Sequence, residues 1–289
     1  MEPKSISIVT DSTADIPDEL LHDNHIHMVN NLIIIEGHSF EDRRELSRQD
    51  FYERLPNMKS FPTTATASSG TYQKLYGKLY QQGVDFIFSI HASSKLSGIF
   101  NAACLAAQAF GERIRVIDSE NISLGLGYQV LAAAEAVKQG LSVEIILSLL
   151  TNIRQRIHVM AMLDTLEYVR RSGRVNWVRA RLGDVLRIKP LLAVKNGQVV
   201  SLGEARTYRK GVARLVEALK NIGPLEHLAI LHTNAEKEAH EFLQYVADQI
   251  PEIPLLINVT TVIGSHVGPN GLGFVAIKRE LGGDEIISG

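Results

Sequence analysis

Short apolar runs alternate with stretches of helical periodicity through the first half of the chain. The apolar runs predict strands at residues 6–10, 26–35, 86–90 and 115–117. Helical patterns follow at residues 72–82, after Ser97, from Ser123 to Val137 and from Ser142 to about Ile157. Near the N-terminus, Asp15 is expected to cap a helix with Pro17 in its first turn. Strands that alternate with helices predict a parallel sheet.

The second half has a different pattern, in which a hairpin precedes amphipathic helices. Asn196-Gly197 separates apolar runs at 191–194 and 199–202, and this dipeptide favours a type I′ turn. Further strands are predicted at 159–163, 227–232, 255–259 and 274–277, and helices at 165–171, 208–222 and 235–249. We therefore predict an α/β protein of two domains. Residues 1–157 form a parallel-sheet α/β domain, and residues 158–289 an α+β domain with a mixed or antiparallel sheet.

Serine and threonine concentrate at predicted strand ends and in one long loop, at residues 11–13, 63–71, 93–97 and 118–123. In an open α/β sheet, ligands bind beyond the carboxyl ends of the strands. The stretch 86–103 joins a strand to a helix through a small polar turn, which gathers free N–H groups at a helix N-terminus. A single serine there is ordinarily an N-cap, but the recurrence favours a hydroxyl-lined site for a small anion.

Composition and charge restrict the function further. The chain has 289 residues, 45% hydrophobic and 21% charged, with a formal net charge of −2. This balance gives no electrostatic case for nucleic acid or an anionic membrane. One cysteine excludes a disulfide framework, and no apolar run reaches the ~20 residues of a membrane span, so a cytoplasmic protein is expected. Nucleotide-binding and zinc motifs are missing, and we expect no cofactor or metal.

Two further features need an explanation. His266 lies in a tight stretch of glycine and apolar residues, where its ring either bonds a backbone carbonyl or donates to an anion. Residues 168–189 hold seven basic residues against the single acid Asp184, together with the only tryptophan, Trp177. Tryptophan among arginines is typical of an interface, so this segment predicts a protein partner or a phosphate site, with nucleic-acid binding as the competing interpretation.

Seven blocks of the sequence, in order along the chain, resemble the DegV family. They are residues 10–17, 62–70, 93–98, 116–119, 163–174, 188–192 and 264–273. The resemblance implies a two-domain α/β protein that holds one long-chain fatty acid in a narrow apolar tunnel. It also implies a non-catalytic role as the binding subunit of a two-component fatty-acid kinase. A separate ATP-binding subunit would phosphorylate the presented carboxylate.

The resemblance also implies roles for individual residues. The fatty-acid carboxylate would contact Thr64, His266 and Ser94 or its neighbour Ser93, above the helix N-terminus at Ser97-Gly98. Arg171 and Arg206 would face the reacting head group or the kinase subunit. The chain departs from the family pattern at two places. Ile99-Phe100 stands where the family commonly has Thr-Tyr, and Asn270-Gly271 where it has Gly-Ala.

The alternative is an acyl or phosphate-ester hydrolase. Ser94 or Ser97 would be its nucleophile, His266 its base, and Asp11 or Asp118 the carboxylate that orients the base. The G-x-S-x-G motif of α/β-hydrolases is missing from the sequence, which weighs against this interpretation.

Overall fold

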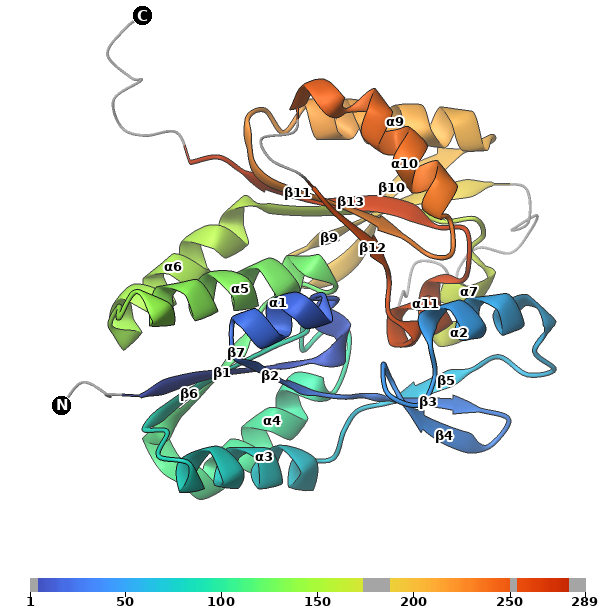
Figure 1. Ribbon diagram of the computed structural model, residues 1–289. Coiled ribbons are helices and arrows are strands. Elements are labelled where there is room, and N and C mark those ends of the chain that lie inside the picture. Colours follow the sequence, from blue (N-terminus) through green and yellow to red (C-terminus); the bar gives the residue numbers. More distant parts are fainter. Residues whose placement is uncertain (1–4, 174–187, 250–253, 281–289) are drawn as a thin grey trace, which may run out of the picture.

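The computed structural model describes residues 5–173, 188–249 and 254–280, which form stacked layers of helices and sheets (Figure 1). A four-stranded sheet has the order β2-β1-β6-β7, and a six-stranded sheet has the order β10-β9-β8-β13-β11-β12. All pairs in the first sheet are parallel, whereas the second is antiparallel except for the β11–β12 pair. The predicted fold class is confirmed.

The first sheet is built from β1 (Ile6–Asp11), β2 (Ile26–Val29), β6 (Phe86–His91) and β7 (Ile114–Asp118). Helices α3 (Ser69–Gln81) and α4 (Ile99–Ala107) cover one face, and α5 (Leu124–Lys138) covers the other (Figure 1). The short helix α1 (Asp18–Asp23) packs near β2. Because β1 and β6 are the inner strands, most of their side chains are buried on both faces, the polar ones at their carboxyl ends included. We call this unit the first lobe.

The second sheet contains β8 (Ile157–Met162), β9 (Lys189–Lys195), β10 (Gln198–Ala205), β11 (Leu225–His232), β12 (Leu255–Asn258) and β13 (Leu272–Lys278). Helices α9 (Tyr208–Lys220) and α10 (Glu236–Tyr245) cover its outer face (Figure 1). Phe242 of α10 and Phe274 of β13 stack there, with ring centroids 6.5 Å apart. The turn between β9 and β10 has φ 49° at Asn196 and 75° at Gly197, as the predicted type I′ turn requires. We call this unit the second lobe.

Helices α5 and α6 (Val143–Arg156) lie between the two sheets, so that both lobes share one helical layer (Figure 1). One hydrophobic cluster runs through this layer, from Ile8 in the first sheet through Val130 of α5 to Val275 in the second. The predicted domain division at 157/158 falls where α6 leads into β8 without an intervening loop.

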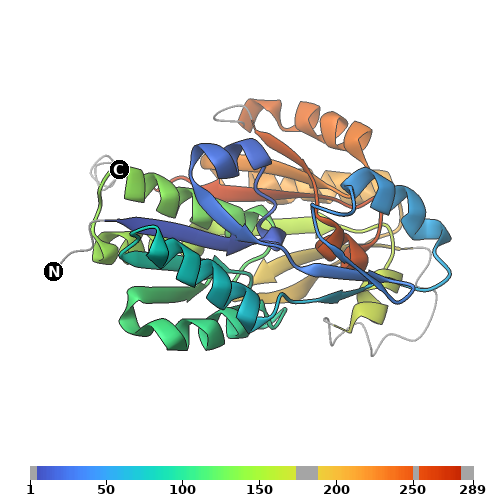
Figure 2. The same ribbon diagram turned by 60° about the horizontal axis from the view of Figure 1, so that its bottom comes forward.

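A small antiparallel sheet with the order β4-β3-β5 lies beside both lobes and is missing from the sequence prediction. It consists of β3 (Leu32–Ile35), β4 (His38–Glu41) and β5 (Thr63–Ala65). Helix α2 (Arg48–Arg54) lies between β4 and β5 along the chain. Figure 2 shows it next to α11 (Thr261–Val267), and α7 (Glu167–Ser172) packs on the other side of α11. The predicted strand 26–35 is therefore two strands in different sheets, and the predicted loop 62–71 contains a strand.

The predicted capping role of Asp15 is wrong. Helix α1 starts at Asp18 after Pro17, and Asp15 lies earlier in a left-handed conformation at φ 57°. Its carboxylate is fully buried and accepts bonds from the Ser123 hydroxyl at 2.6 Å and from the Thr260 N–H at 2.8 Å. Asp15 therefore ties three distant segments together instead of starting a helix.

Candidate functional site

A hollow with a polar end opens between β5, the β6–α4 turn, α7 and α11. It encloses about 900 Å³ of space, part of it open to solvent. The polar side chains in its wall are Thr13, Asn31, Thr64, Thr66, Ser97, Ser172 and His266. The remaining wall is aliphatic, including Leu96, Val169 and Val262.

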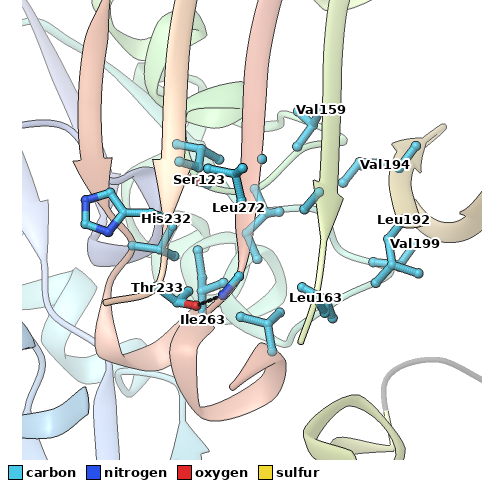
Figure 3. A pocket seen from close by; sticks show the side chains of 18 residues that line it. Ser123, Val159, Leu163, Leu192, Val194, Val199, His232, Thr233, Ile263 and Leu272 are labelled. Atoms are coloured by element: carbon cyan, nitrogen blue, oxygen red, sulfur yellow. Dashed lines mark hydrogen bonds between the residues drawn. The ribbon is translucent and has the colours of Figure 1, made fainter. Parts of the chain in front are cut away.

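A second hollow of about 650 Å³ continues along the inner face of the six-stranded sheet. Figure 3 shows aliphatic side chains such as Val159, Leu163 and Val194 around it, with the ring of His232 turned away. The two hollows share five wall residues, Ile122, Leu192, Val199, Ile263 and Val267. They therefore adjoin, and we call the two together the cavity, with the first hollow as its polar end and the second as its apolar end.

Thr64 and His266 form the centre of the polar end. Thr64 lies on β5, where it pairs with Ile33, and His266 lies in the last turn of α11. The Thr64 Oγ1 and His266 Nε2 atoms are 2.9 Å apart, and both residues are half-buried in the cavity wall. Ser97 and Gly98 reach the same wall at the start of α4. The structure thus brings together Thr64, Ser97, Gly98 and His266.

Ser93 and Ser94 do not line this cavity. The Ser93 hydroxyl is fully buried and donates to the Gly197 carbonyl at 2.8 Å, while the Ser94 N–H donates to Asp118 Oδ2 at 3.2 Å. Lys95 Nζ also donates to the Asn196 carbonyl, at 2.9 Å. The turn at Ser93 therefore holds the β9–β10 hairpin against the first lobe.

The two arginines singled out from the sequence lie in different places. Arg171 is exposed on α7, the helix that also contributes Val169 and Ser172 to the polar end. Its guanidinium carbon is 3.9 Å from the centre of the Phe61 ring, and it pairs with Glu167 at 2.7 Å. Arg206 is exposed directly before α9 and is not part of the cavity wall. Arg174, Trp177, Asp184 and the other positions from 174 to 187 lie outside the described residues.

Three wall residues, Thr13, Asn31 and Ala92, were not picked out individually from the sequence. All three bond to Asp11, which is fully buried behind the wall. Thr13 belongs to a predicted hydroxyl cluster, which was the available signal. Asn31 carries no sequence signal, because one asparagine between two short strands is ordinarily a turn residue.

Buried polar contacts hold the start of α11, and so the position of His266. The Thr261 hydroxyl donates to Asp42 Oδ1 at 2.7 Å, and the Tyr52 hydroxyl donates to the Val259 carbonyl at 2.9 Å. Burial raises the pKa of Asp42 and of Asp15, although nearby arginines and hydrogen bonds act in the opposite direction. These contacts fix the start of a short helix that has a glycine, Gly264, at its centre.

The arrangement predicted for a hydrolase is not assembled. Asp11 bonds His91 instead of His266, with 3.0 Å between Oδ2 and Nδ1. Asp118 accepts from the N–H groups of Ser94 and Glu120. Neither carboxylate is therefore available to orient His266 as a general base.

In the part of the chain that the structure describes, no three His, Cys, Asp or Glu residues are arranged to hold a metal ion. Within residues 5–173, 188–249 and 254–280, no helix combines the length and apolar character needed to cross a membrane.

Asp11 should make stability depend on pH in a specific direction. Burial alone would raise its pKa, but the hydrogen bond and charge of His91 and the bonds from Thr13 outweigh it and lower the pKa. The carboxylate therefore makes its full contribution to stability at pH values above its unfolded-state pKa of about 4. This contribution is lost as the pH falls through the lower folded-state pKa.

We expect the difference in unfolding free energy between wild type and Asp11→Asn to shrink as pH falls from 5 to below about 4, the reference pKa of aspartate. Chemical denaturation across this range measures it. A difference that grows toward low pH would contradict the assigned direction.

Fold and site together define a class of protein: a two-lobed α/β protein with two adjoining, mainly apolar hollows, one of which has hydroxyl and imidazole groups in its wall. The family model described as "Uncharacterised protein, DegV family" matches residues 5–279. A DegV domain-containing protein of Listeria innocua is 32% identical over 276 residues, which cover 93% of this chain and 97% of that protein. The chain belongs to the DegV family.

Solved structures of the same family have the same fold. A fatty-acid-binding DegV family protein of Thermus thermophilus matches with a TM-score of 0.89 at 31% identity, covering 96% of this chain and all of that one. DegV of Bacillus subtilis, described as a fatty acid binding protein, matches with a TM-score of 0.85 at 31% identity and covers 95% of this chain and 99% of its own. The sequence resemblance to DegV is confirmed.

Proposed function

We propose that this protein binds one long-chain fatty acid, with its carboxylate at the polar end of the cavity and its tail in the apolar end. The observation that carries the proposal is that a hollow with polar groups adjoins an apolar one and shares five aliphatic wall residues with it. A fatty acid matches this arrangement, because it has a charged carboxylate at one end and a long apolar tail. The fatty acids bound by relatives in Thermus thermophilus and Bacillus subtilis support the same ligand class.

The two ends make different contributions to binding. Thr64, His266 and Ser97 would hold the carboxylate by hydrogen bonds, each worth about 1.5–3 kcal/mol because one partner is charged. The tail would supply most of the affinity, at about 0.8 kcal/mol per buried methylene. Ser93 and Ser94 retain a role in this proposal only through the turn that they form, which sets the start of α4.

Extraction of the denatured protein followed by mass spectrometry tests the ligand. We expect one fatty acid per chain, or stoichiometric uptake of added palmitate or oleate. A clean extract from a folded protein that also refuses both acids would overturn the proposal.

Replacement of Thr64 by valine should weaken binding of oleate by about 10- to 100-fold, because it removes one hydrogen bond to the carboxylate while keeping the shape of the side chain. Isothermal titration measures the affinity. Thr63→Val is the matched control, since Thr63 is exposed on the same strand and points to the opposite face. Equal affinities for the two variants would contradict the assigned role of Thr64.

We also propose that the loaded protein is the non-catalytic subunit of a fatty-acid kinase. A separate ATP-binding subunit would transfer the γ-phosphoryl group to a carboxylate oxygen, releasing ADP and forming an acyl phosphate. Helix α7 supports this role, since its exposed Arg170 and Arg171 flank the polar end where the carboxylate would be presented. Arg206 lies apart from that end, and a role for it would require a large partner surface.

A further inference from the structure

Behind the polar end lies a row of buried groups that the proposed function does not use. Asp11, Ser89, His91 and Tyr76 each have no exposed surface. His91 Nδ1 lies 3.0 Å from Asp11 Oδ2, His91 Nε2 lies 2.7 Å from Ser89 Oγ, and Ser89 Oγ lies 2.7 Å from the Tyr76 hydroxyl. The row runs from the cavity wall into the core of the first lobe.

Asp11 holds the polar wall together from behind. Its Oδ1 atom accepts from the Thr13 N–H at 3.0 Å, from the Thr13 hydroxyl and from Asn31 Nδ2 at 3.3 Å. Its Oδ2 atom accepts from the Ala92 N–H at 3.2 Å. Thr13, Asn31 and Ala92 all line the polar end, whereas Asp11 itself does not. One carboxylate therefore fixes three wall residues that come from three separate segments of the chain.

The buried Asp11 carboxylate thus lies directly behind the wall residues that would surround the carboxylate of a bound fatty acid. Two like charges in the interior of a protein repel each other unless a nearby donor offsets one of them. The His91 ring nitrogen Nδ1 is the side-chain partner of Asp11 Oδ2, and Thr13, Asn31 and Ala92 supply further donors. Tyr76 and Ser89 at the far side of the ring fix its orientation.

We propose that His91 is a positioning residue that offsets the charge of Asp11, so that the wall organised by Asp11 can accept an anionic head group. This inference rests on the proposed function, and it assigns selectivity for an acid over the matching neutral lipid to a residue outside the cavity.

The test compares oleate with oleyl alcohol, which share the tail and differ at the head group. His91→Gln keeps an amide where Nε2 lies but loses the group that faces Asp11, so oleate should bind about tenfold more weakly, while oleyl alcohol changes less than twofold. His91→Asn places an amide donor near Nδ1 and should keep both affinities close to those of wild type. The double variant Asp11→Asn/His91→Gln should recover most of the ratio of oleate to oleyl alcohol affinity, because the uncompensated charge is gone.

Equal weakening of both ligands in His91→Gln would show a purely structural role and overturn the inference, as would a double variant no better than the single one. If His91→Gln does not fold, the single variant Asp11→Asn tests the inference by itself. Its ratio of oleate to oleyl alcohol affinity should stay constant or rise, and a fall would contradict the inference. A wild-type protein that binds neither ligand would instead refute the proposed function, which separates the two failures.

Discussion

Ala161→Phe should abolish tight binding of long-chain fatty acids while the protein stays folded. Ala161 lies on β8 in the wall of the apolar hollow, between Leu192 on β9 and Gly273 on β13. A phenyl ring there would occupy the space of the tail. If it displaces about four methylenes, the loss is about 3 kcal/mol, or more than 100-fold in affinity.

The free energy of unfolding of the lipid-free protein should be unchanged or higher for this variant, because the new ring fills existing space. Titrations with palmitate and decanoate measure the effect on binding, and the shorter acid should lose less. Ala161→Val is the graded control and should fall between wild type and the phenylalanine variant. Undiminished palmitate binding in Ala161→Phe would place the tail elsewhere.

Gly264→Ala should destabilise the protein and weaken ligand binding together. A methyl group at Gly264 would lie 2.4 Å from the Tyr52 hydroxyl oxygen and 2.7 Å from the adjoining ring carbon. Tyr52 is buried and donates to the Val259 carbonyl, so either this bond or the position of α11 has to change. Overpacking of this kind costs about 1–3 kcal/mol. Because α11 carries His266, oleate affinity should fall as well.

Chemical denaturation and oleate titration measure the two effects of Gly264→Ala. Gly77→Ala is the matched control: Gly77 lies within α3 with no atom near the added methyl group, so this change should stabilise by about 0.5–1 kcal/mol. In a Tyr52→Leu background, which lacks the atoms that collide, Gly264→Ala should cost much less oleate affinity than it does in wild type. If the loss is the same in both backgrounds, contact with Tyr52 is not the cause.

The elements with strong periodicity were predictable from the sequence, and those held by distant contacts were not. The inner strands β1 and β6 contain short apolar runs that are buried, and the Asn-Gly turn fixes the β9–β10 hairpin locally. Strand β5 has only three residues, of which two are threonines, and it exists because β3 pairs with it. Local sequence carries no information about such a pairing.

The candidate site was likewise predictable only in part, because some of its residues are placed by contacts with distant segments. The hydroxyl clusters and the glycine-rich context of His266 indicate Thr64, Ser97 and His266, the family resemblance assigns them to the carboxylate, and all three line the polar end. The role of Ser93 depends on the β9–β10 turn about a hundred residues away, which the pattern around Ser93 does not reveal. Asp11 was considered only as part of a hydroxyl cluster or a hydrolase, because its partner His91 lies on another strand.

The helical layer shared by the two lobes has a consequence for how the chain folds. Helix α5 buries apolar side chains against both sheets, and Val130 and Ala133 have no exposed surface. A fragment that ended after α6 would leave one side of this layer uncovered in water, at a cost that grows with the exposed apolar area. The two halves are therefore distinct in architecture but interdependent in stability, and the chain gains or loses its native state as one cooperative unit.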